Sequence, residues 1–381
     1  MTHVALAGLV ALAVAMGIGR FAFTPILPMM QQTAGVSVTT GGWLASANYL
    51  GYLLGALSVP ALRMAPATAI RGGLVMIVLV TLGMGASHAL VIWIVLRALA
   101  GIGSAWVLIF TSSWCLERLS GTARPILNGV VFAGVGSGIA LAGAVCLVLM
   151  QRSASSGQAW AALGLVALAG TAMVWRTFGT TGRTSSMAPR RTEPPARRWD
   201  GRWVPLVLCY GVFGFGYIVP ATFVPVMARQ FTTDPVVFGW AWPVFGAAAA
   251  LTPFGGAVWA PRMGIRRVWI ASQGAMALGV AMPVVWPTIG GIMLAALLVG
   301  GTFMVITMSG MQEARAVAGH GATPLMAAMT AAFGAGQIAG PIVATFVLGA
   351  DPRFSQALLI SSALLLVTTA LLAIQRTERR H

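Results

Sequence analysis

An arginine lies inside the first apolar segment of the chain, where a charged side chain is costly. Arg20 follows the run Gly17-Ile18-Gly19 and precedes Phe21, and no acidic residue lies near it in the sequence. A cation within a membrane span costs several kcal/mol unless it faces a polar cavity and finds a partner, so such residues are functional candidates. We therefore expect Arg20 to bind an anionic group, which a ligand can supply.

A second arginine, Arg97, lies inside the fourth apolar segment. Because a helix rises 1.5 Å per residue, Arg20 lies about 12 Å from the end of its segment at Pro28, and Arg97 lies about 10 Å from the start of its own. The two cations are therefore predicted at similar depth. The planar fork of a guanidinium suits a bidentate grip on a carboxylate. For Arg97, hydrogen bonding to the carbonyls of neighbouring helices is an equally good interpretation.

Aromatic and amide side chains in other apolar segments are candidates for the wall of the same site. All four tyrosines fall in the second and seventh segments. Besides Arg20 and Arg97, we predict as substrate-binding the residues Asn48, Tyr49, Tyr52, Tyr217, Trp240 and Gln337, with Trp242 as a further wall residue. Each also has a structural interpretation, since tyrosine and tryptophan anchor helices at membrane interfaces and a glutamine can bridge two helices.

The composition places these residues in a membrane protein. Hydrophobic residues make up 58% of the chain and charged residues 8%, with a mean hydropathy of +0.88. Apolar stretches of about 20 residues, long enough to cross a bilayer as helices, recur about twelve times. The predicted spans are 5–29, 41–62, 69–87, 90–114, 125–150, 158–177, 204–228, 236–259, 267–287, 290–311, 323–348 and 354–375. The predicted fold class is an all-α membrane protein.

The arginines indicate how the chain crosses the membrane. All 23 basic residues are arginines, and the net charge is +16. They concentrate in alternate loops, which explains the charge better than a nucleic-acid partner does. We predict a multi-pass protein of the cell inner membrane. By the positive-inside rule, both of its termini are predicted to lie in the cytoplasm.

An arginine- and proline-rich stretch divides the chain into two similar halves. We predict an N-terminal bundle over residues 1–178, a cytoplasmic linker over 179–202 and a C-terminal bundle over 203–381. Gly17 and Gly214 lie 197 residues apart, and Pro28 and Pro225 share this offset. Such internal repeats are common in transporters, whose substrate site lies between the repeats. The same offset places Tyr217 opposite Arg20.

The chain resembles the major facilitator superfamily over essentially its whole length. Arg97 with glycines four and six positions later resembles the superfamily's fourth-helix pattern, and Arg262 to Arg267 resembles the basic half of its loop signature. The Gly-x-Gly-Arg-Phe opening resembles a bacterial branch with few assigned substrates. The resemblance implies two pseudo-symmetric six-helix bundles, with Arg20 and Arg97 facing one ligand. Two departures are the missing loop aspartate, where Pro261 stands, and a fifth helix without the Gly-Pro pattern of the family's exporters.

The few acidic residues bear on gating and on the energy source. Glu117 and Glu313 lie near helix ends on the predicted cytoplasmic side, and we predict that they act with Arg262 and Arg266 in gating or coupling. The predicted spans themselves hold no carboxylate, so a buried proton relay is poorly supported. With no lysine there is no Walker A sequence. Proton coupling, anion exchange and facilitated diffusion all remain open.

These observations favour a transporter over an enzyme. The sequence has neither H-E-x-x-H nor G-x-S-x-G, and its three cysteines are scattered in apolar segments, so we expect no catalysis, no cofactor and no metal site. The leading hypothesis is a monomeric secondary active transporter that moves a small organic anion, of the carboxylate type, by alternating access. The alternatives are proton-driven efflux of drugs or metabolites, and a membrane receptor or scaffold that does not transport.

Overall fold

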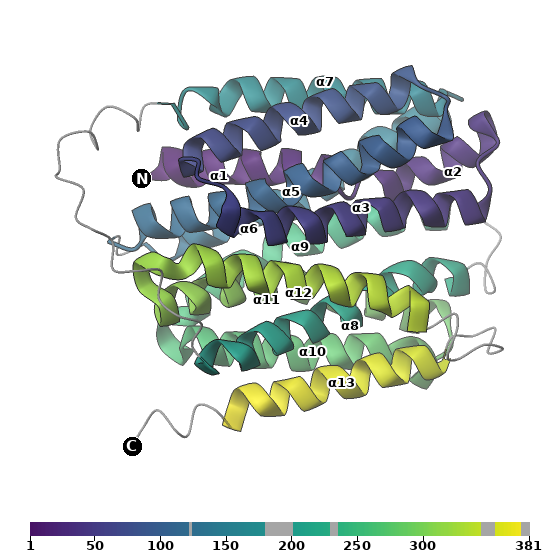
Figure 1. Ribbon diagram of the computed structural model, residues 1–381. Coiled ribbons are helices and arrows are strands. Elements are labelled where there is room, and N and C mark those ends of the chain that lie inside the picture. The colour runs from purple at the N-terminus through teal and green to yellow at the C-terminus, as the bar shows by residue number, and fades with distance from the viewer. Residues whose placement is uncertain (122–123, 180–200, 229–234, 344–354, 375–381) are drawn as a thin grey trace.

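The computed structural model describes the chain except for residues 122–123, 180–200, 229–234, 344–354 and 375–381 (Figure 1). Its described part is helical, without a strand. The first bundle comprises α1 (Thr2–Leu12), the π-helix η1 (Ala13–Ile18), α2 (Phe23–Ala34), α3 (Val38–Ser58), α4 (Pro66–Ala86), α5 (Leu90–Leu119), α6 (Ile126–Gln151) and α7 (Ser156–Trp175). The second comprises α8 (Val204–Ala228), α9 (Pro235–Met263), α10 (Ile265–Val285), α11 (Ile289–Ala318), α12 (Ala322–Ile342) and α13 (Ser355–Ile374).

The predicted spans are confirmed as helices, with one difference in hydropathy. Eleven of the described spans are long and apolar enough to cross a membrane. The second span, α3, is not among them although it has 21 residues. Its threonines, serines, asparagine and tyrosines lower its hydropathy, as expected for a helix with a face toward a polar interior.

The helices form two bundles that repeat the same packing. In the first bundle α3 packs against α5, and in the second α9 packs against α11. Likewise, α1 packs against α6 as α8 packs against α12. This correspondence is the one that the repeat in the sequence predicts. The predicted linker of residues 179–202 lies almost wholly outside the described residues, and the bundle boundaries at 178 and 203 stay a prediction.

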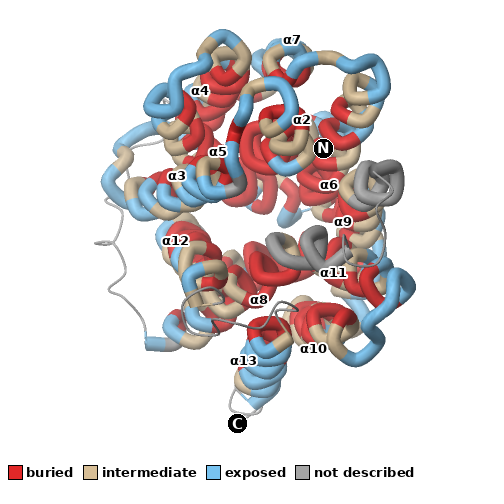
Figure 2. Tube along the Cα trace, turned by 90° about the vertical axis from the view of Figure 1, so that its right-hand side faces the viewer, coloured by how far each residue is buried: buried red, intermediate tan, exposed pale blue. Residues whose placement is uncertain are grey.

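The most extensive contacts between the bundles are made by two pairs of helices, α3 with α12 and α6 with α9 (Figure 2). Along α6, Gly129, Gly136 and Gly143 face α9. A Cβ atom at Gly129 would lie 2.8 Å from the carbonyl oxygen of Pro253, and one at Gly136 would overlap the backbone of Ala250. Glycines thus allow the two helices to approach closely, as is common between membrane helices.

The outer surface of the molecule is apolar. Leu79, Val91 and Met173 have exposed fractions of 63%, 72% and 74%, whereas buried residues line the inner faces of the helices (Figure 2). Helices that are apolar on both faces are typical of a protein surrounded by hydrocarbon. The N-terminus and the end of α13 lie on the same side of the molecule, as twelve crossings require (Figure 1).

Candidate functional site

The first membrane span is broken at Arg20. The backbone N–H of Gly19 donates to Val14 at 3.0 Å and that of Phe21 donates to Met16 at 3.0 Å, which are the five-residue steps of a π-helix. Regular helix resumes only at Phe23. Short π-helical segments inside α-helices are frequent at functional sites.

The glycines before Arg20 let two other helices approach this break. A Cβ atom at Gly17 would overlap the backbone of Gly138 in α6, and one at Gly19 would overlap the side chain of Ile77 in α4. A larger residue at either position would push these helices away. The Gly-x-Gly-Arg motif therefore fixes where the arginine sits between its neighbours.

Side chains of α5 bond the backbone carbonyls of the broken segment. Arg97 donates from Nη1 to the carbonyl of Gly19 at 3.2 Å and from Nη2 to that of Arg20 at 3.3 Å. Ser104 Oγ donates to the carbonyl of Ala15 at 2.7 Å. Inside a membrane such carbonyls must be satisfied by the protein. Arg97 thus makes the carbonyl contacts of its structural interpretation, and direct contact with a ligand stays a prediction for it.

The side chain of Arg20 lies between the two bundles. Its Nη2 donates to Oε1 of Gln337, on α12 of the second bundle. Its guanidinium carbon lies 3.7 Å from the ring centroid of Tyr52, 5.8 Å from that of Tyr49 and 5.9 Å from that of Phe333. The exposed fraction is 3% for Arg20 and 0% for Gln337. The structure therefore places three other predicted site residues, Gln337, Tyr52 and Tyr49, around the buried cation of Arg20.

The surroundings of Arg20 hold a surplus of hydrogen-bond donors. Among the described residues, Arg20 Nε and Nη1 and Gln337 Nε2 are buried without a hydrogen-bond partner, and so are Arg97 Nε and Trp242 Nε1. Among the acceptors of the predicted site residues, Asn48 Oδ1 is also buried without a hydrogen-bond partner. Buried polar groups are normally paired, so the unpaired donors of Arg20 and Gln337, whose side chains contact each other, favour a site for an acceptor-rich group.

The second bundle faces this cation with aromatic rings. Phe21, next to Arg20, lies 6.5 Å from Tyr217, 6.4 Å from Trp242 and 5.9 Å from Phe303, measured between ring centroids. Tyr217 stacks on Phe303 at 4.3 Å. Tyr217, the repeat counterpart of Arg20, thus belongs to an aromatic wall that the second bundle contributes.

Two further predicted site residues, Asn48 and Trp240, are not shown in contact with Arg20. Asn48 is fully buried, and its Nδ2 donates to the carbonyl of Arg97 at 3.0 Å, which ties α3 to α5. A Cβ atom at Gly101 would overlap the carbonyl oxygen of Asn48, so this glycine, four residues after Arg97, allows α3 and α5 to pack closely. Trp240 lies in α9, but its side chain is outside the described residues.

Sequence reasoning missed the phenylalanines of the site. Phe333 lies four residues before Gln337, a spacing that puts both on one face of α12, and this spacing was a usable signal. Phe303 offered none, because a phenylalanine in an apolar helix looks the same whether it faces the interior or lipid. Its role emerges only from its contacts with Phe21 and Tyr217.

The residues predicted for gating lie at the end of the molecule that carries the N-terminus. Arg266 Nη1 and Glu313 Oε1 lie 3.9 Å apart, and their side chains are 11% and 8% exposed. Gly264, with φ of +88°, makes the tight turn between α9 and α10 that presents Arg266. Glu117 and Arg262 are exposed at helix ends. The gating role of these four residues stays a prediction.

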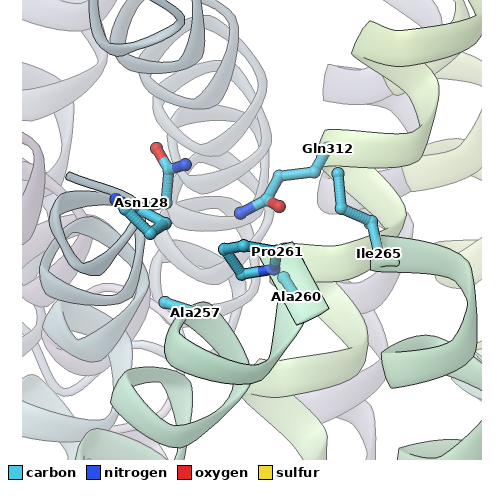
Figure 3. A pocket seen from close by; sticks show the side chains of 7 residues that line it. Asn128, Ala257, Ala260, Pro261, Ile265 and Gln312 are labelled. Atoms are coloured by element: carbon cyan, nitrogen blue, oxygen red, sulfur yellow. The ribbon is translucent and has the colours of Figure 1, made fainter. Parts of the chain in front are cut away.

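A cavity of about 190 Å³ lies beside this ion pair, where α6 of the first bundle meets the second bundle (Figure 3). It is lined by Pro125, Asn128, Ala257, Ala260, Pro261, Ile265 and Gln312. The carboxamides of Asn128 and Gln312 point toward each other across it (Figure 3). The cavity therefore separates part of α6 from the second bundle, whereas Ser113 Oγ of α5 and Thr323 Oγ1 of α12 join the two bundles by a hydrogen bond of 2.8 Å.

The chain was compared with known protein families and proteins. It matches the family described as "Uncharacterised MFS-type transporter YbfB" over residues 12–373. The match runs from α1 into α13 and includes Arg20, Arg97 and Gln337. No curated protein matches the chain in sequence.

Proposed function

Since the chain belongs to this family of MFS-type transporters, it is a multi-pass membrane transporter of the secondary type, and we propose that its cargo is a small organic anion bound at Arg20. The observation that carries the proposal is the set of buried donors without partners around Arg20 and Gln337. An ionised carboxylate accepts hydrogen bonds and donates none, so it matches this set.

The charge of the site supports an anion over a cation. The acidic residues in the described part of the chain are Glu117 and Glu313. Glu117 lies near the end of α5 and Glu313 near the end of α11, whereas Arg20 lies in the middle of the first span. A cationic cargo would then meet a buried guanidinium with no carboxylate to offset it. A carboxylate would neutralise Arg20 and form charge-assisted hydrogen bonds with it.

The aromatic wall supports a cargo with an apolar body. Tyr217, Trp242 and Phe303 lie around Phe21, on the side of the second bundle. A ligand whose carboxylate binds Arg20 would lay the rest of its surface against these rings. Binding sites for small molecules commonly combine a few polar groups with such an apolar lining. We therefore propose a carboxylate with an aliphatic or aromatic body.

We propose that the two bundles expose this site to either side of a bacterial-type inner membrane in turn. The positions of the arginines support cytoplasmic termini. Because no carboxylate of the described spans lies near Arg20, protons that accompany transport would travel with the substrate or through Glu117 and Glu313. Anion exchange and facilitated diffusion are the alternatives that the experiment below separates from proton symport.

The test is uptake of labelled carboxylates, aliphatic and aromatic, into proteoliposomes with and without an imposed pH gradient. Arg20→Gln should abolish saturable uptake. Arg20→Lys should keep the charge but raise the KM about tenfold, because an ammonium cannot form the bidentate fork. Arg152→Gln is the control, since Arg152 is an exposed arginine that ends α6 far from the site.

Each result decides between functions. Saturable uptake that Arg20→Gln leaves unchanged would contradict the proposal. A flux that does not respond to the pH gradient would exclude proton symport. Gradient-driven movement of a cationic dye, without uptake of any anion, would favour the efflux alternative, and ligand binding without any flux would favour a receptor.

A further inference from the structure

The hydrogen bond between Arg20 and Gln337 crosses from one bundle to the other. Gln337 is held in place by small neighbours on α12. A Cβ atom at Gly336 would overlap the backbone of Gly211 in α8, and one at Gly334 would lie 3.3 Å from Leu53 in α3. The helix is thus packed closely on two sides, which fixes the position of the amide beside the cation.

This bond gives a buried cation an acceptor that the protein itself supplies. When the empty transporter changes sides, both entrances to the site are closed for a time. Arg20 is then buried without the substrate carboxylate. Burying an unpaired charge is strongly unfavourable. Gln337 Oε1 accepts a hydrogen bond from Arg20, and the ring of Tyr52 lies 3.7 Å from the guanidinium carbon on its face. Both contacts reduce this penalty.

We propose that Gln337 sets the mode of transport, because it substitutes for the substrate carboxylate at Arg20 and so allows the empty transporter to change sides. With Gln337, the protein performs net uptake as well as exchange of one anion for another. Without it, only the loaded transporter crosses, and the protein becomes an obligatory exchanger. This inference rests on the proposed function, since it requires that an anion binds Arg20.

An amide is suited to this role because it is a weaker partner than a carboxylate. A neutral carbonyl oxygen bonds a guanidinium less strongly than an ionised carboxylate does, so an incoming anion can take its place. Gln337 also uses a single nitrogen of Arg20, and Nε and Nη1 stay without a partner among the described residues. A glutamate at this position would instead pair with Arg20 as an ion pair and compete with the anion for it.

The experiment compares two fluxes in the same proteoliposomes. Net uptake of a labelled carboxylate is measured into vesicles that contain none, and exchange is measured into vesicles preloaded with the unlabelled compound. In Gln337→Leu and Gln337→Met, net uptake should fall about 10- to 100-fold more than exchange does, the effect of one hydrogen bond to a charged group that only the empty transporter needs.

Gln273→Leu is the matched control. Gln273 is also a fully buried glutamine, but it bonds Trp269 and Thr368 inside the second bundle. If general destabilisation were the cause of an effect, this variant would lower net uptake and exchange by the same factor. Gln337→Glu should raise the KM of both fluxes, because its carboxylate competes with the substrate for Arg20.

Three results would overturn the inference. They are a wild type that only exchanges, an equal fall of both fluxes in Gln337→Leu and Gln337→Met, and a Gln337→Glu transporter with the wild-type KM. Failure of the proposed function itself looks different, because Arg20→Gln would then transport the carboxylate as the wild type does.

Discussion

Arg97 donates a hydrogen bond from Nη2 to the backbone carbonyl of Arg20, over 3.3 Å. The side chain of Arg97 therefore holds the backbone of Arg20, and the two guanidiniums have different partners. Arg97 uses both Nη groups on carbonyls of the broken helix, whereas Arg20 keeps two nitrogens without a partner among the described residues. We propose that Arg97 positions Arg20 and that Arg20 binds the substrate.

We expect Arg97→Gln to impair transport by displacing Arg20. Each lost hydrogen bond to a charged group contributes about 1.5 to 3 kcal/mol, and the carbonyls of Gly19 and Arg20 would be left unbonded. Carboxylate uptake should fall, mainly in its maximal rate, and the melting temperature in detergent should drop. Uptake kinetics and a thermal melt measure both effects.

Arg71→Gln is the matched control for this variant. Arg71 also bonds a carbonyl, that of Trp175, at 2.6 Å, and its guanidinium carbon lies 4.6 Å from the Trp175 ring centroid. It lies far from Arg20 in the fold. Its loss should lower the melting temperature without a change in uptake per folded protein. Equal effects of the two substitutions on uptake would contradict a positioning role for Arg97.

We expect the ring of Tyr52 to matter for Arg20 and its hydroxyl to matter little. The guanidinium carbon lies 3.7 Å from the ring centroid, and a desolvated cation–π contact contributes about 2 kcal/mol. Tyr52→Phe should therefore transport like the wild type, and Tyr52→Leu should lose roughly 10- to 30-fold in uptake rate. If the two variants lose uptake equally, the hydroxyl and not the ring is the important group.

We expect the ion pair between Arg266 and Glu313 to stabilise the end of the molecule that carries the N-terminus. Both side chains are largely buried at a separation of 3.9 Å, so Glu313→Gln, which removes one partner of a buried ion pair, should lower the free energy of unfolding by about 3 kcal/mol. The exchanged pair Arg266→Glu with Glu313→Arg should recover part of this loss, as a thermal melt in detergent would show. Arg262→Gln, at an exposed arginine nearby, should leave the melt unchanged.

We expect a disulfide between positions 113 and 323 to stop transport. Ser113 Oγ and Thr323 Oγ1 lie 2.8 Å apart across the bundle interface, a geometry that suits the short Cβ separation of a disulfide. With Cys115, Cys146 and Cys209 replaced by alanine, Ser113→Cys with Thr323→Cys should form an intramolecular bond on oxidation. Uptake should cease and return on reduction. Continued transport by the oxidised protein would show that this contact does not open, and each single-cysteine variant serves as a control.

The membrane spans were predictable from the sequence because hydropathy reports burial in hydrocarbon directly. The residues at which the helices end were harder to predict. We predicted spans that end at 114 and 311, yet α5 continues to Leu119 and α11 to Ala318. The polar residues there, including Glu117 and Glu313, lie beyond the apolar stretch but still within the helix. A hydropathy pattern marks the membrane and not the end of the helix.

The candidate site was predictable in its members but not in their contacts. A buried cation is costly wherever it lies, so Arg20 could be recognised from its own segment. The break in the first helix could not, because it depends on the distant Gly138 and on the side chains of Arg97 and Ser104. For the same reason, the sequence left both interpretations of Arg97 open until its bonding partners were known.

The glycine face of α6 determines how one bundle can move against the other. Gly129, Gly136 and Gly143 meet Pro253, Ala250 and Pro243 on α9, so small residues lie on both sides of the contact at these three positions. A rotation of one bundle about this contact would displace few side-chain atoms at these three positions. We therefore expect polar links between the bundles, such as that between Arg20 and Gln337, to contribute to the activation barrier of the movement.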